Sequence, residues 1–359
     1  MTKPETRPGQ AAVVALCMLC LFGCAAEDAA EDIVYTDALD VTVMSFNVQN
    51  LFDNTDDPGK DDKAYLPVAA KRDLAHIAAC NEIEVRSWRD ECLNLDWSDA
   101  AIEHKLDVLA ATIRQVEGGA DIIALQEVEN RAILERLRLE KLGDLGYEPA
   151  VLIEGSDTRG IDVAFLSRLP LASEPVLHPA SFPEFPDREG DTRGVLQADF
   201  ELADGTVLTA FSVHFPAPFH PVEMRETAYR QLAALLEGLP RDRAAVAAGD
   251  FNTTSSENAE KKMLDRLARS HWIIAHELGC TVCKGTHYSS YNKSWSFLDM
   301  ILFSPSRGEN ATARIRGDSV RIVAGFTQQI RDDGTPRRYR SDARSGVSDH
   351  LPIVATLEL

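Results

Sequence analysis

The chain has 359 residues, of which 45% are hydrophobic and 26% charged, and its formal net charge at pH 7 is −20. A chain of this length can bury a substantial core, and no internal repeat or long linker divides it, so we predict one large domain. A surface this acidic repels polyanions unless a cation or a local basic patch intervenes, which excludes tight nucleic-acid binding without a metal.

The first 23 residues have the pattern of an export signal. Lys3 and Arg7 precede an uncharged run at 11–22, and Gly23 stands immediately before Cys24. The run is too short to span a bilayer, which takes about 20 residues. It resembles a bacterial lipoprotein signal, in which Cys24 becomes the lipid-modified N-terminus that holds the protein at a membrane. A short anchoring or buried helix is the alternative.

Residues 24–39 are acidic and rich in alanine, which predicts a flexible tether ahead of the domain. Removal of residues 1–23 changes the formal net charge from −20 to −21, because two basic residues and one acidic residue are lost. These features indicate a protein of the bacterial cell envelope, either lipid-anchored or secreted. We expect it to be a monomer.

Four cysteines follow Cys24 and form two close pairs, Cys80 with Cys92 and Cys280 with Cys283. In an exported protein, we interpret them as two local disulfides. A structural zinc site is the alternative, because the spacing at 280–283 suits zinc ligands, but the first pair lacks the matching tight spacing.

The rest of the chain alternates strand and helix patterns. Strands are predicted at 41–48, 121–125, 163–166, 195–202, 207–214, 244–248, 298–303 and 352–357. Helices are predicted at 102–116, 131–142, 222–239 and 258–268. The polar, irregular stretch at 54–99 is predicted to be a surface insertion, with a short helix near 74–80. This pattern predicts an α/β domain at 40–359 in which two packed mixed sheets carry helices on their outer faces.

Polar clusters stand at the ends of several apolar runs. They occur at 45–48, 125–128, 249–252, 297–299 and 348–350. Taken singly, each has an ordinary explanation as a turn, a helix start or a boundary histidine. Their recurrence indicates strands that converge on a metal-assisted phosphoester site, because carboxylate and amide oxygens suit hard cations.

Together with the segments at 159–164 and 213–215, these clusters resemble the motifs of the endonuclease/exonuclease/phosphatase superfamily. That superfamily includes deoxyribonuclease I, apurinic endonucleases, neutral sphingomyelinases and inositol polyphosphate 5-phosphatases. The resemblance covers about residues 40–359, and the motifs stand in family order. It implies a four-layer α/β sandwich and a phosphoester hydrolase that depends on Mg²⁺, with Mn²⁺ or Ca²⁺ as alternatives.

The resemblance also implies roles for the residues around the metal. Glu127 would be the principal metal ligand, with Asn47 and Asp349 close to it. Asp250 would orient or deprotonate the attacking water, for which it must stay ionised. Asn252, two residues further along an extended segment, would donate its amide to a phosphoryl oxygen.

Two histidines would face the phosphate under the same resemblance. His350 would contact it, with Asp299 fixing the ring and favouring its charged form, and His214 would be a second donor. Asp162 and Arg193 stand in strings like those of bacterial relatives. Arg193 is suited to hold a phosphate with two hydrogen bonds, and an ordinary salt bridge is the equal alternative.

Two further features bear on substrate binding. Gln49 stands where several relatives carry an acid, which weakens a second metal contact at that position. The segment at 331–344 contains five arginines and three aspartates and directly precedes the catalytic motif at 348–350. It is either a solvated loop or a lip that guides anions toward the site.

The leading functional hypothesis is an exported, Mg²⁺-dependent phosphodiesterase or nuclease acting on nucleic acid or nucleotides. A second hypothesis is a phosphatase or sphingomyelinase-like phospholipase acting on lipid or inositol headgroups, which a membrane tether would suit. A third, from another class, is a lipoprotein that binds a ligand without catalysis. The complete set of Glu127, Asp250 and His350 with their partners argues against the third.

Overall fold

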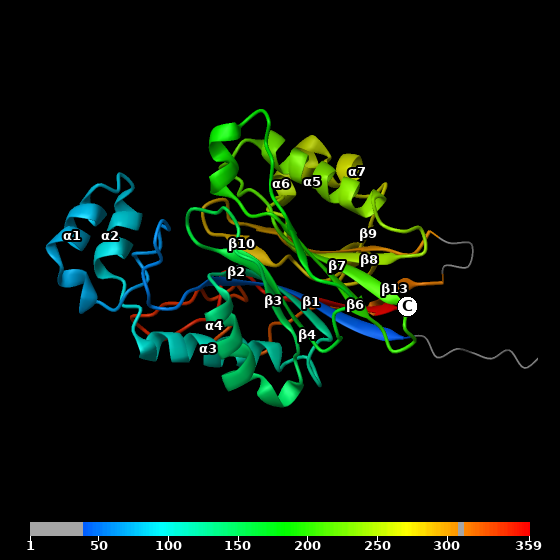
Figure 1. Ribbon diagram of the computed structural model, residues 1–359, viewed down its shortest axis with the longest axis horizontal. Helices are drawn as coiled ribbons and strands as arrows, with labels where there is room; N and C mark the ends of the chain where they lie inside the picture. The colour runs from blue at the N-terminus through cyan, green and yellow to red at the C-terminus, as the bar shows by residue number, and fades with distance from the viewer. Residues whose placement is uncertain (1–38, 308–311) are drawn as a thin grey trace, which may run out of the picture. The chain divides into compact units, whose positions relative to one another are not determined.

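The computed structural model describes residues 39–307 and 312–359, which form two six-stranded sheets and one two-stranded sheet (Figure 1). The predicted signal, Cys24 and the tether up to residue 38 lie outside these residues. Within the described ranges, none of the helices has the length and apolar character needed to cross a bilayer.

The first six-stranded sheet is built around the parallel pair β1 and β2, and its other neighbouring strands are antiparallel. Its strands, in spatial order, are β13 (Arg314–Ile322), β14 (Ile353–Glu358), β1 (Asp40–Leu51), β2 (Ile122–Val128), β4 (Asp162–Ser167) and β3 (Ala150–Leu152). Helices α3 (Asp99–Ile113) and α4 (Arg131–Arg136) cover its outer face, and α4 continues into a π-helical turn at Leu137–Lys141.

The second six-stranded sheet is built around the parallel pair β7 and β8. Its strands, in spatial order, are β5 (Val176–His178), β6 (Val195–Glu201), β7 (Val207–His214), β8 (Ala244–Asp250), β12 (Asp299–Ser304) and β9 (Ile273–Ile274). Helices α5 (Val222–Glu237), α6 (Ser255–Lys261) and α7 (Met263–Leu267) lie on its outer side (Figure 1). The hairpin of β10 (His287–Ser289) and β11 (Ser294–Ser296) follows the short helix α8 (Ala275–Leu278).

Alternation along the strands divides the core into layers. In β1, Val43 packs between the two sheets, whereas Met44 and Phe46 pack against α3 and its neighbours. A third cluster, which includes Phe211 and Leu232, lies between the second sheet and α5. Successive strand residues point to opposite faces, and both faces of each sheet are covered, which explains the nearly continuous apolar runs. The four-layer α/β sandwich expected from the sequence is confirmed.

Some predicted elements differ from the structure. The single helix predicted at 258–268 is broken into α6 and α7, because Lys262 adopts a left-handed conformation with φ 54°. The unpredicted strand β13 lies at a sheet edge and carries several arginines, so it lacks the apolar pattern of a buried strand. The other unpredicted strands, β3, β5, β9, β10 and β11, have only two or three residues each.

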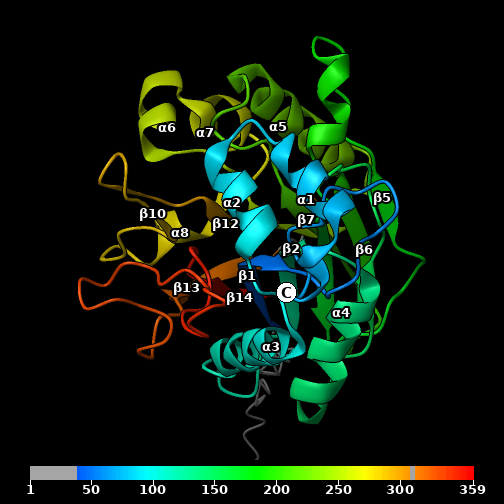
Figure 2. The same ribbon diagram turned by 90° about the vertical axis from the view of Figure 1, so that its left-hand side faces the viewer.

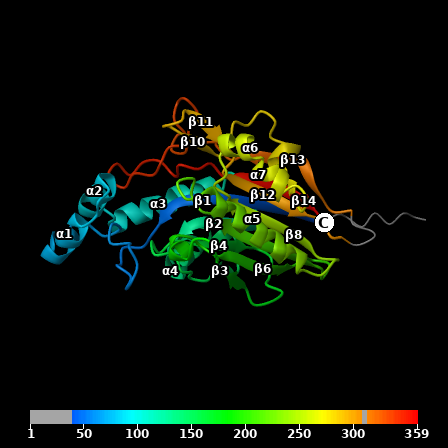
Figure 3. The ribbon, with the colours of Figure 1, turned by 90° about the horizontal axis from the view of Figure 1, so that it is seen from above.

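The stretch at 54–99 contains α1 (Leu74–Asn81) and α2 (Arg86–Asn94). These helices stand beyond the end of the sheet where β1 finishes, as the three views agree (Figures 1, 2 and 3). The short helix predicted near 74–80 is therefore present as α1, and α2 was not predicted.

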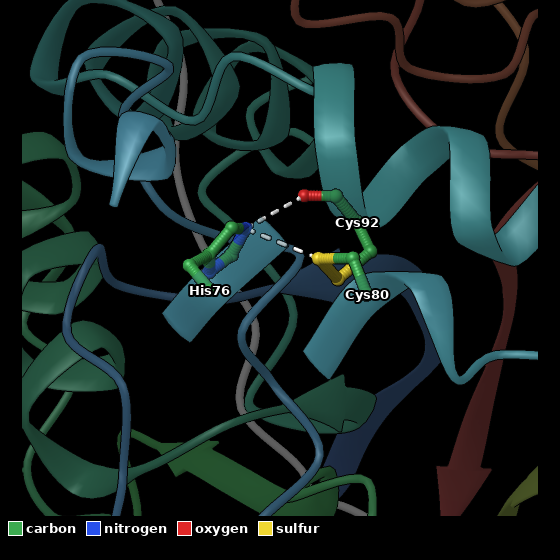
Figure 4. A group of neighbouring side chains, drawn as sticks. All are labelled: His76, Cys80 and Cys92. Atoms are coloured by element: carbon green, nitrogen blue, oxygen red, sulfur yellow. Dashed lines mark hydrogen bonds between the residues drawn. A yellow bond between two sulfur atoms is a disulfide. The ribbon is translucent and has the colours of Figure 1, made fainter. Parts of the chain in front are cut away.

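Both predicted disulfides are present, Cys80 with Cys92 and Cys280 with Cys283. The first joins α1 to α2, and the Nε2 atom of His76 lies 3.2 Å from Cys80 Sγ and 3.1 Å from the Cys92 carbonyl oxygen (Figure 4). This trio has the residue types of a zinc site. Its sulfur atoms are bonded to each other, however, so they do not offer the thiolates that zinc binds.

Candidate active site

The candidate site lies where the two parallel strand pairs end. In the first sheet, Asn47 of β1 stands opposite Gln126 of β2, one residue before Glu127. In the second sheet, His214 of β7 stands opposite Asp250 of β8. Because the carboxyl ends of parallel strands meet at one edge, each pair presents its polar residues together.

The backbone at this edge is irregular. Near Glu127, the register of β2 shifts against both neighbouring strands, β1 and β4. Glu127 itself has a φ of 66°. Gln49, Asn50 and Asn252 also have positive φ values, of 53°, 54° and 50°. Left-handed conformations cost non-glycine residues about 1–2 kcal/mol each, and such strain gathers at functional sites. A bulge changes the direction in which its side chain points. The Glu127 side chain lines a cleft that also contains Asp250 and His350.

Asn47 connects two carboxylates across the site. Its Nδ2 atom donates to Glu127 Oε1 at 3.3 Å and to Asp250 Oδ2 at 3.1 Å. Its Oδ1 atom accepts from the Gln49 backbone N–H at 3.0 Å, and the Asn50 backbone N–H donates to Glu127 Oε2 at 2.9 Å. Asn47 thus holds both acids in place, and a metal contact through its oxygen would require the amide to rotate.

His350 is enclosed by acids. Its Nδ1 atom lies 2.7 Å from Asp299 Oδ2, and its Nε2 atom lies 3.8 Å from Asp250 Oδ2. Burial opposes the charged ring, but the carboxylates of Asp299 and Asp250 outweigh it and hold the pKa of His350 well above its ordinary value. The ring is therefore an imidazolium at neutral pH, with its Nε2–H on the side of Asp250.

Asp250 and His214 are both buried at the centre of the cleft. Burial raises the pKa of Asp250 to about 7, against the opposing effect of His350. His214 Nε2 lies 3.6 Å from Asp250 Oδ2, and burial, together with Arg193 and Arg159, holds the pKa of His214 well below its ordinary value. His214 is therefore a neutral hydrogen-bonding group, in contrast to the charged His350.

Asn252 lies beside these groups. Its backbone N–H donates to Asp250 Oδ1 at 2.9 Å, which fixes the carboxylate. Its Nδ2 atom donates to the Phe215 carbonyl at 2.9 Å, so one amide hydrogen is used by the protein and one is left for a ligand.

Asp349 lies close to His350 and His287. Asp349, His350 and His287 each offer a ligand atom within 4.8 Å of the others. Burial disfavours ionisation of Asp349, but the charges of His350 and Arg338 outweigh it and hold the pKa of Asp349 below its ordinary value. Burial lowers the pKa of His287 to about 4, so this ring is neutral. The carboxylates of Asp349 and Glu127 are the groups suited to a hard divalent cation.

A cleft lined by Glu127, His214, Asp250, Asn252 and His350 has a volume of about 320 Å³, and Asn47, Asp299 and Asp349 are not among the described residues that line it. Arg159, Arg188 and Arg193 line it, and the exposed aromatic rings of Trp88 and Phe219 stand at its rim. Arg193 is buried, and its Nε atom lies 3.0 Å from the Asp157 carboxylate. Both interpretations offered for Arg193 therefore agree with its position, because it makes an ion pair and also faces the cleft.

Asp162 is not among the described residues that line the cleft. Its Oδ1 atom accepts from the Gly155 backbone N–H at 2.9 Å, so it holds a loop next to the cleft residues at 158–159. Arg159, from the same motif, takes the cleft position, and its Nη2 atom donates to Asn50 Oδ1 at 3.1 Å.

Other cleft residues were not singled out in the sequence, namely Arg188, His220, Trp88 and Phe219, and neither was His287 beside His350. Arg159 is the cleft residue that the sequence could have indicated, because it stands in the motif at 159–164.

Gln49 does not contribute to a metal site in this arrangement. Its side chain donates to the Tyr339 carbonyl at 3.4 Å and accepts from the Tyr339 N–H at 2.9 Å. It therefore fastens the segment that contains Arg338 to the end of β1.

The sandwich and its edge of carboxylates, amides and histidines define the deoxyribonuclease I-like class of α/β proteins. The chain belongs to the endonuclease/exonuclease/phosphatase family, whose model matches residues 92–350. The comparison with curated protein sequences gives no match.

Solved structures share the fold at low sequence identity. An endonuclease/exonuclease/phosphatase from Beutenbergia cavernae has 17% identity and a TM-score of 0.54, with 89% of this chain and 72% of that chain covered. D. rerio TDP2 complexed with single strand DNA product has 16% identity and a TM-score of 0.52, with coverage of 89% and 99%. The Bacteroides thetaiotaomicron mannosyl-6-phosphatase Bt3783 has 15% identity and a TM-score of 0.55, with coverage of 89% and 100%.

Proposed function

We propose that the protein is a divalent-metal-dependent phosphodiesterase that acts on nucleic acid or nucleotides. The observation that carries this proposal is the meeting of Asp250, the His350 imidazolium and Glu127 in one arginine-lined cleft. Together they provide a base, a charged hydrogen-bond donor and a hard oxygen ligand, which are the groups that phosphoester hydrolysis requires.

Each group has a distinct task. Asp250, fixed by Asn47 and Asn252, would accept the proton of the attacking water. The Nε2–H of His350 would donate to a phosphoryl oxygen as negative charge develops there. Glu127 and Asp349 would hold Mg²⁺, which when bound supplies Lewis-acid stabilisation of the phosphoryl oxygens.

The rim of the cleft favours a substrate that carries planar groups. Trp88 is 59% exposed and Phe219 is 78% exposed, and both line the same cleft as Asp250. Exposed aromatic rings next to a cationic groove stack on nucleic-acid bases, at about 1–3 kcal/mol per base. This arrangement supports a nucleotide-containing diester over a lipid headgroup.

A panel of substrates tests the proposal. With Mg²⁺ present, the protein should release product from a short single-stranded oligonucleotide and from bis(p-nitrophenyl) phosphate, and the Glu127→Gln variant should not. Trp88→Ala should weaken the oligonucleotide reaction more than the reaction of the small diester. Hydrolysis of phosphomonoesters or sphingomyelin without cleavage of either diester would overturn the proposed substrate class.

A phosphomonoesterase that acts on a sugar or headgroup phosphate is the second candidate. Arg159, Arg188 and Arg193 in a cleft of about 320 Å³ suit a compact group with two negative charges. A higher kcat/KM for mannose 6-phosphate or inositol phosphates than for the diesters would favour it. A protein that binds these compounds and hydrolyses none would support the non-catalytic lipoprotein.

We also propose that the protein is exported to the cell envelope as a monomer with a lipid on Cys24. The support is the signal-like pattern at 1–23 and the two disulfides. Cells that express the full chain should incorporate labelled palmitate into it, and the Cys24→Ser variant should carry none. Equal labelling of both would contradict lipid attachment at Cys24.

A further inference from the structure

A second group of carboxylates lies at the ends of β1 and β2, in the loop at 53–62 and at the residue after β2. Asp57, Asp62 and Glu129 each offer an oxygen within 4.8 Å of the others. The side chains of Asp62 and Glu129 are almost fully enclosed, with 1% and 3% of each residue exposed. None of the three lines the cleft that contains Asp250 and His350.

Each of the two buried carboxylates uses one oxygen within the protein and leaves the other free. Asp62 Oδ2 accepts from the Asp57 N–H at 3.0 Å, and Glu129 Oε2 accepts from the Asp53 N–H at 2.6 Å and from Asn130 Nδ2 at 3.1 Å. Among the described residues, no N–H or hydroxyl group donates to Asp62 Oδ1 or Glu129 Oε1, although both atoms are buried. The Asp56 carboxyl lies within hydrogen-bonding reach of Asp62, but it can donate only when it carries a proton. A buried acceptor without a donor costs about 1–3 kcal/mol, and more when it is charged.

The cluster also lacks a protein counter-charge. Within 39–307 and 312–359, no basic side chain makes an ion pair with Asp57, Asp62 or Glu129. The lysines of the same loop are engaged elsewhere, since Lys60 Nζ donates to the Gly155 and Asp157 carbonyls and Lys63 pairs with Asp61. Burial, and to a smaller degree the nearby Asp56 carboxyl, raise the pKa of Asp62 to about 6. A cation would relieve this unfavourable arrangement.

We propose that Asp57, Asp62 and Glu129 form a structural calcium site, separate from the catalytic metal site. The donors are oxygens only, which favours a hard cation over zinc. Calcium binds several carboxylates in a flexible geometry at about 2.3–2.6 Å, whereas magnesium retains most of its water. Asp56, whose carboxyl lies beside that of Asp62, would complete the coordination together with water.

This site would stabilise the loop behind the active site. The calcium would tie the loop that follows β1 to the residue that follows β2, and these two strands carry Asn47 and Glu127. Lys60 of the same loop holds the carbonyl of Asp157, whose carboxylate pairs with Arg193 in the cleft. The inference does not depend on the proposed reaction, because it rests on residues outside the cleft.

Terbium luminescence tests the site directly in the full chain. Terbium substitutes for calcium and is sensitised by nearby aromatic rings; here the Tyr65 N–H donates to the Asp62 carbonyl at 2.7 Å, and the Tyr65 and Trp97 rings lie 5.2 Å apart. The measurements use a Glu127→Gln background, which removes the principal ligand proposed for the catalytic metal. Terbium emission should appear and be displaced by calcium. Asp62→Asn and Glu129→Gln should each abolish it.

Asp61→Asn is the matched control, because Asp61 precedes Asp62, carries the same charge and is exposed to solvent. Calcium at about 5 mM should raise the Tm of the background protein and of the Asp61→Asn variant by roughly 3–8 °C, if its affinity is that of extracellular calcium modules. The Asp62→Asn and Glu129→Gln variants should show no such shift. Without calcium, the Asp62→Asn variant should be at least as stable as the background protein, because it removes a buried carboxylate that has no basic partner.

Two results would overturn the proposal. The first is a Tm of the background protein that calcium does not change, which would mean that the carboxyl groups share protons instead of a cation. The second is a calcium shift that survives in both Asp62→Asn and Glu129→Gln, which would place the ion elsewhere. If one variant fails to fold, the other decides the result.

Discussion

Asn47 on β1 of one sheet and Asp250 on β8 of the other are joined by a hydrogen bond of 3.1 Å. Because Asn47 also donates to Glu127, a single amide fixes the proposed base relative to the proposed metal ligand. The geometry of the site therefore depends on how the two sheets pack. The hydrophobic cluster that includes Val43, Ala124 and Ala248 lies between the sheets and sets the distance between them.

Replacement of Asp250 by asparagine should reduce kcat by at least about 10²-fold, because the base is lost while a similar shape remains. Steady-state hydrolysis of a diester with Mg²⁺ measures the effect. Asp265→Asn, at an exposed acid on α7, is the control and should leave kcat unchanged. Circular dichroism should show the same fold for both variants. Full activity of the Asp250→Asn protein would remove Asp250 from the reaction.

The Asp299–His350 pair should control the alkaline limb of the pH profile. Asp299 raises the pKa of His350, so the imidazolium persists to higher pH and is lost as pH rises through that pKa. In Asp299→Asn the charge is gone and the pKa of His350 falls. The alkaline limb of kcat/KM should then move to lower pH, and NMR titration of the His350 ring should show the same change. An unchanged limb would mean that the charge on His350 is not used.

Much of the fold was predictable because its signals are local. Strands buried on both faces have continuous apolar runs, and most predicted strand boundaries lie within a few residues of those observed, as for β7 and β8. The break at Lys262 was not predictable, because a left-handed conformation there depends on the packing of α7 against the second sheet. Helix α2 was also missed, since its helical pattern lies in a polar segment with few apolar positions.

The site was predictable where function and strand ends coincide. Strand pairing places Asp250 opposite Asp299, and His350 joins them through its hydrogen bond to Asp299. The direction of a loop side chain such as that of Arg159 cannot be inferred in this way. The sequence therefore points to Asp162 in this motif, whereas in the structure Arg159 lines the cleft. Trp88 comes from the 54–99 stretch, and its approach to the cleft depends on how α2 is oriented.

The Cys80–Cys92 disulfide should contribute more to stability than the Cys280–Cys283 disulfide. The cysteines are 12 residues apart in the first and 3 in the second. Loop-closure entropy predicts losses of about 3 and about 2 kcal/mol when the respective pairs are replaced by serine. Urea denaturation of the two double variants measures the free energies of unfolding. A larger loss for the 280–283 pair would show that loop length does not decide these contributions.

Within the arginine-rich segment at 331–344, Arg338 is the residue placed to guide an anion. Its Nε atom lies 3.5 Å from Asp349 Oδ2, and its side chain is 59% exposed. It lines a second cleft of about 840 Å³, which lies between α2 and the loop at 331–345 and also includes Asn50. Arg340 is 67% exposed and also lines this second cleft, but its guanidinium pairs with Asp342 and not with Asp349.

Replacement of Arg338 by glutamine should therefore raise the KM for an anionic substrate and leave kcat nearly unchanged, because an attraction at the approach acts on ground and transition states alike. Arg340→Gln is the matched control, since Arg340 has a similar exposure and charge but makes its two hydrogen bonds to Asp342 and not to the proposed metal ligand Asp349. The difference between the two variants should shrink as the Debye length falls from about 10 Å at 0.1 M salt toward about 3 Å at 1 M. A fall in kcat with unchanged KM would instead mean that Arg338 acts by positioning Asp349. Equal KM values for the parent protein and the Arg338→Gln variant at low salt would identify the segment as a solvated loop.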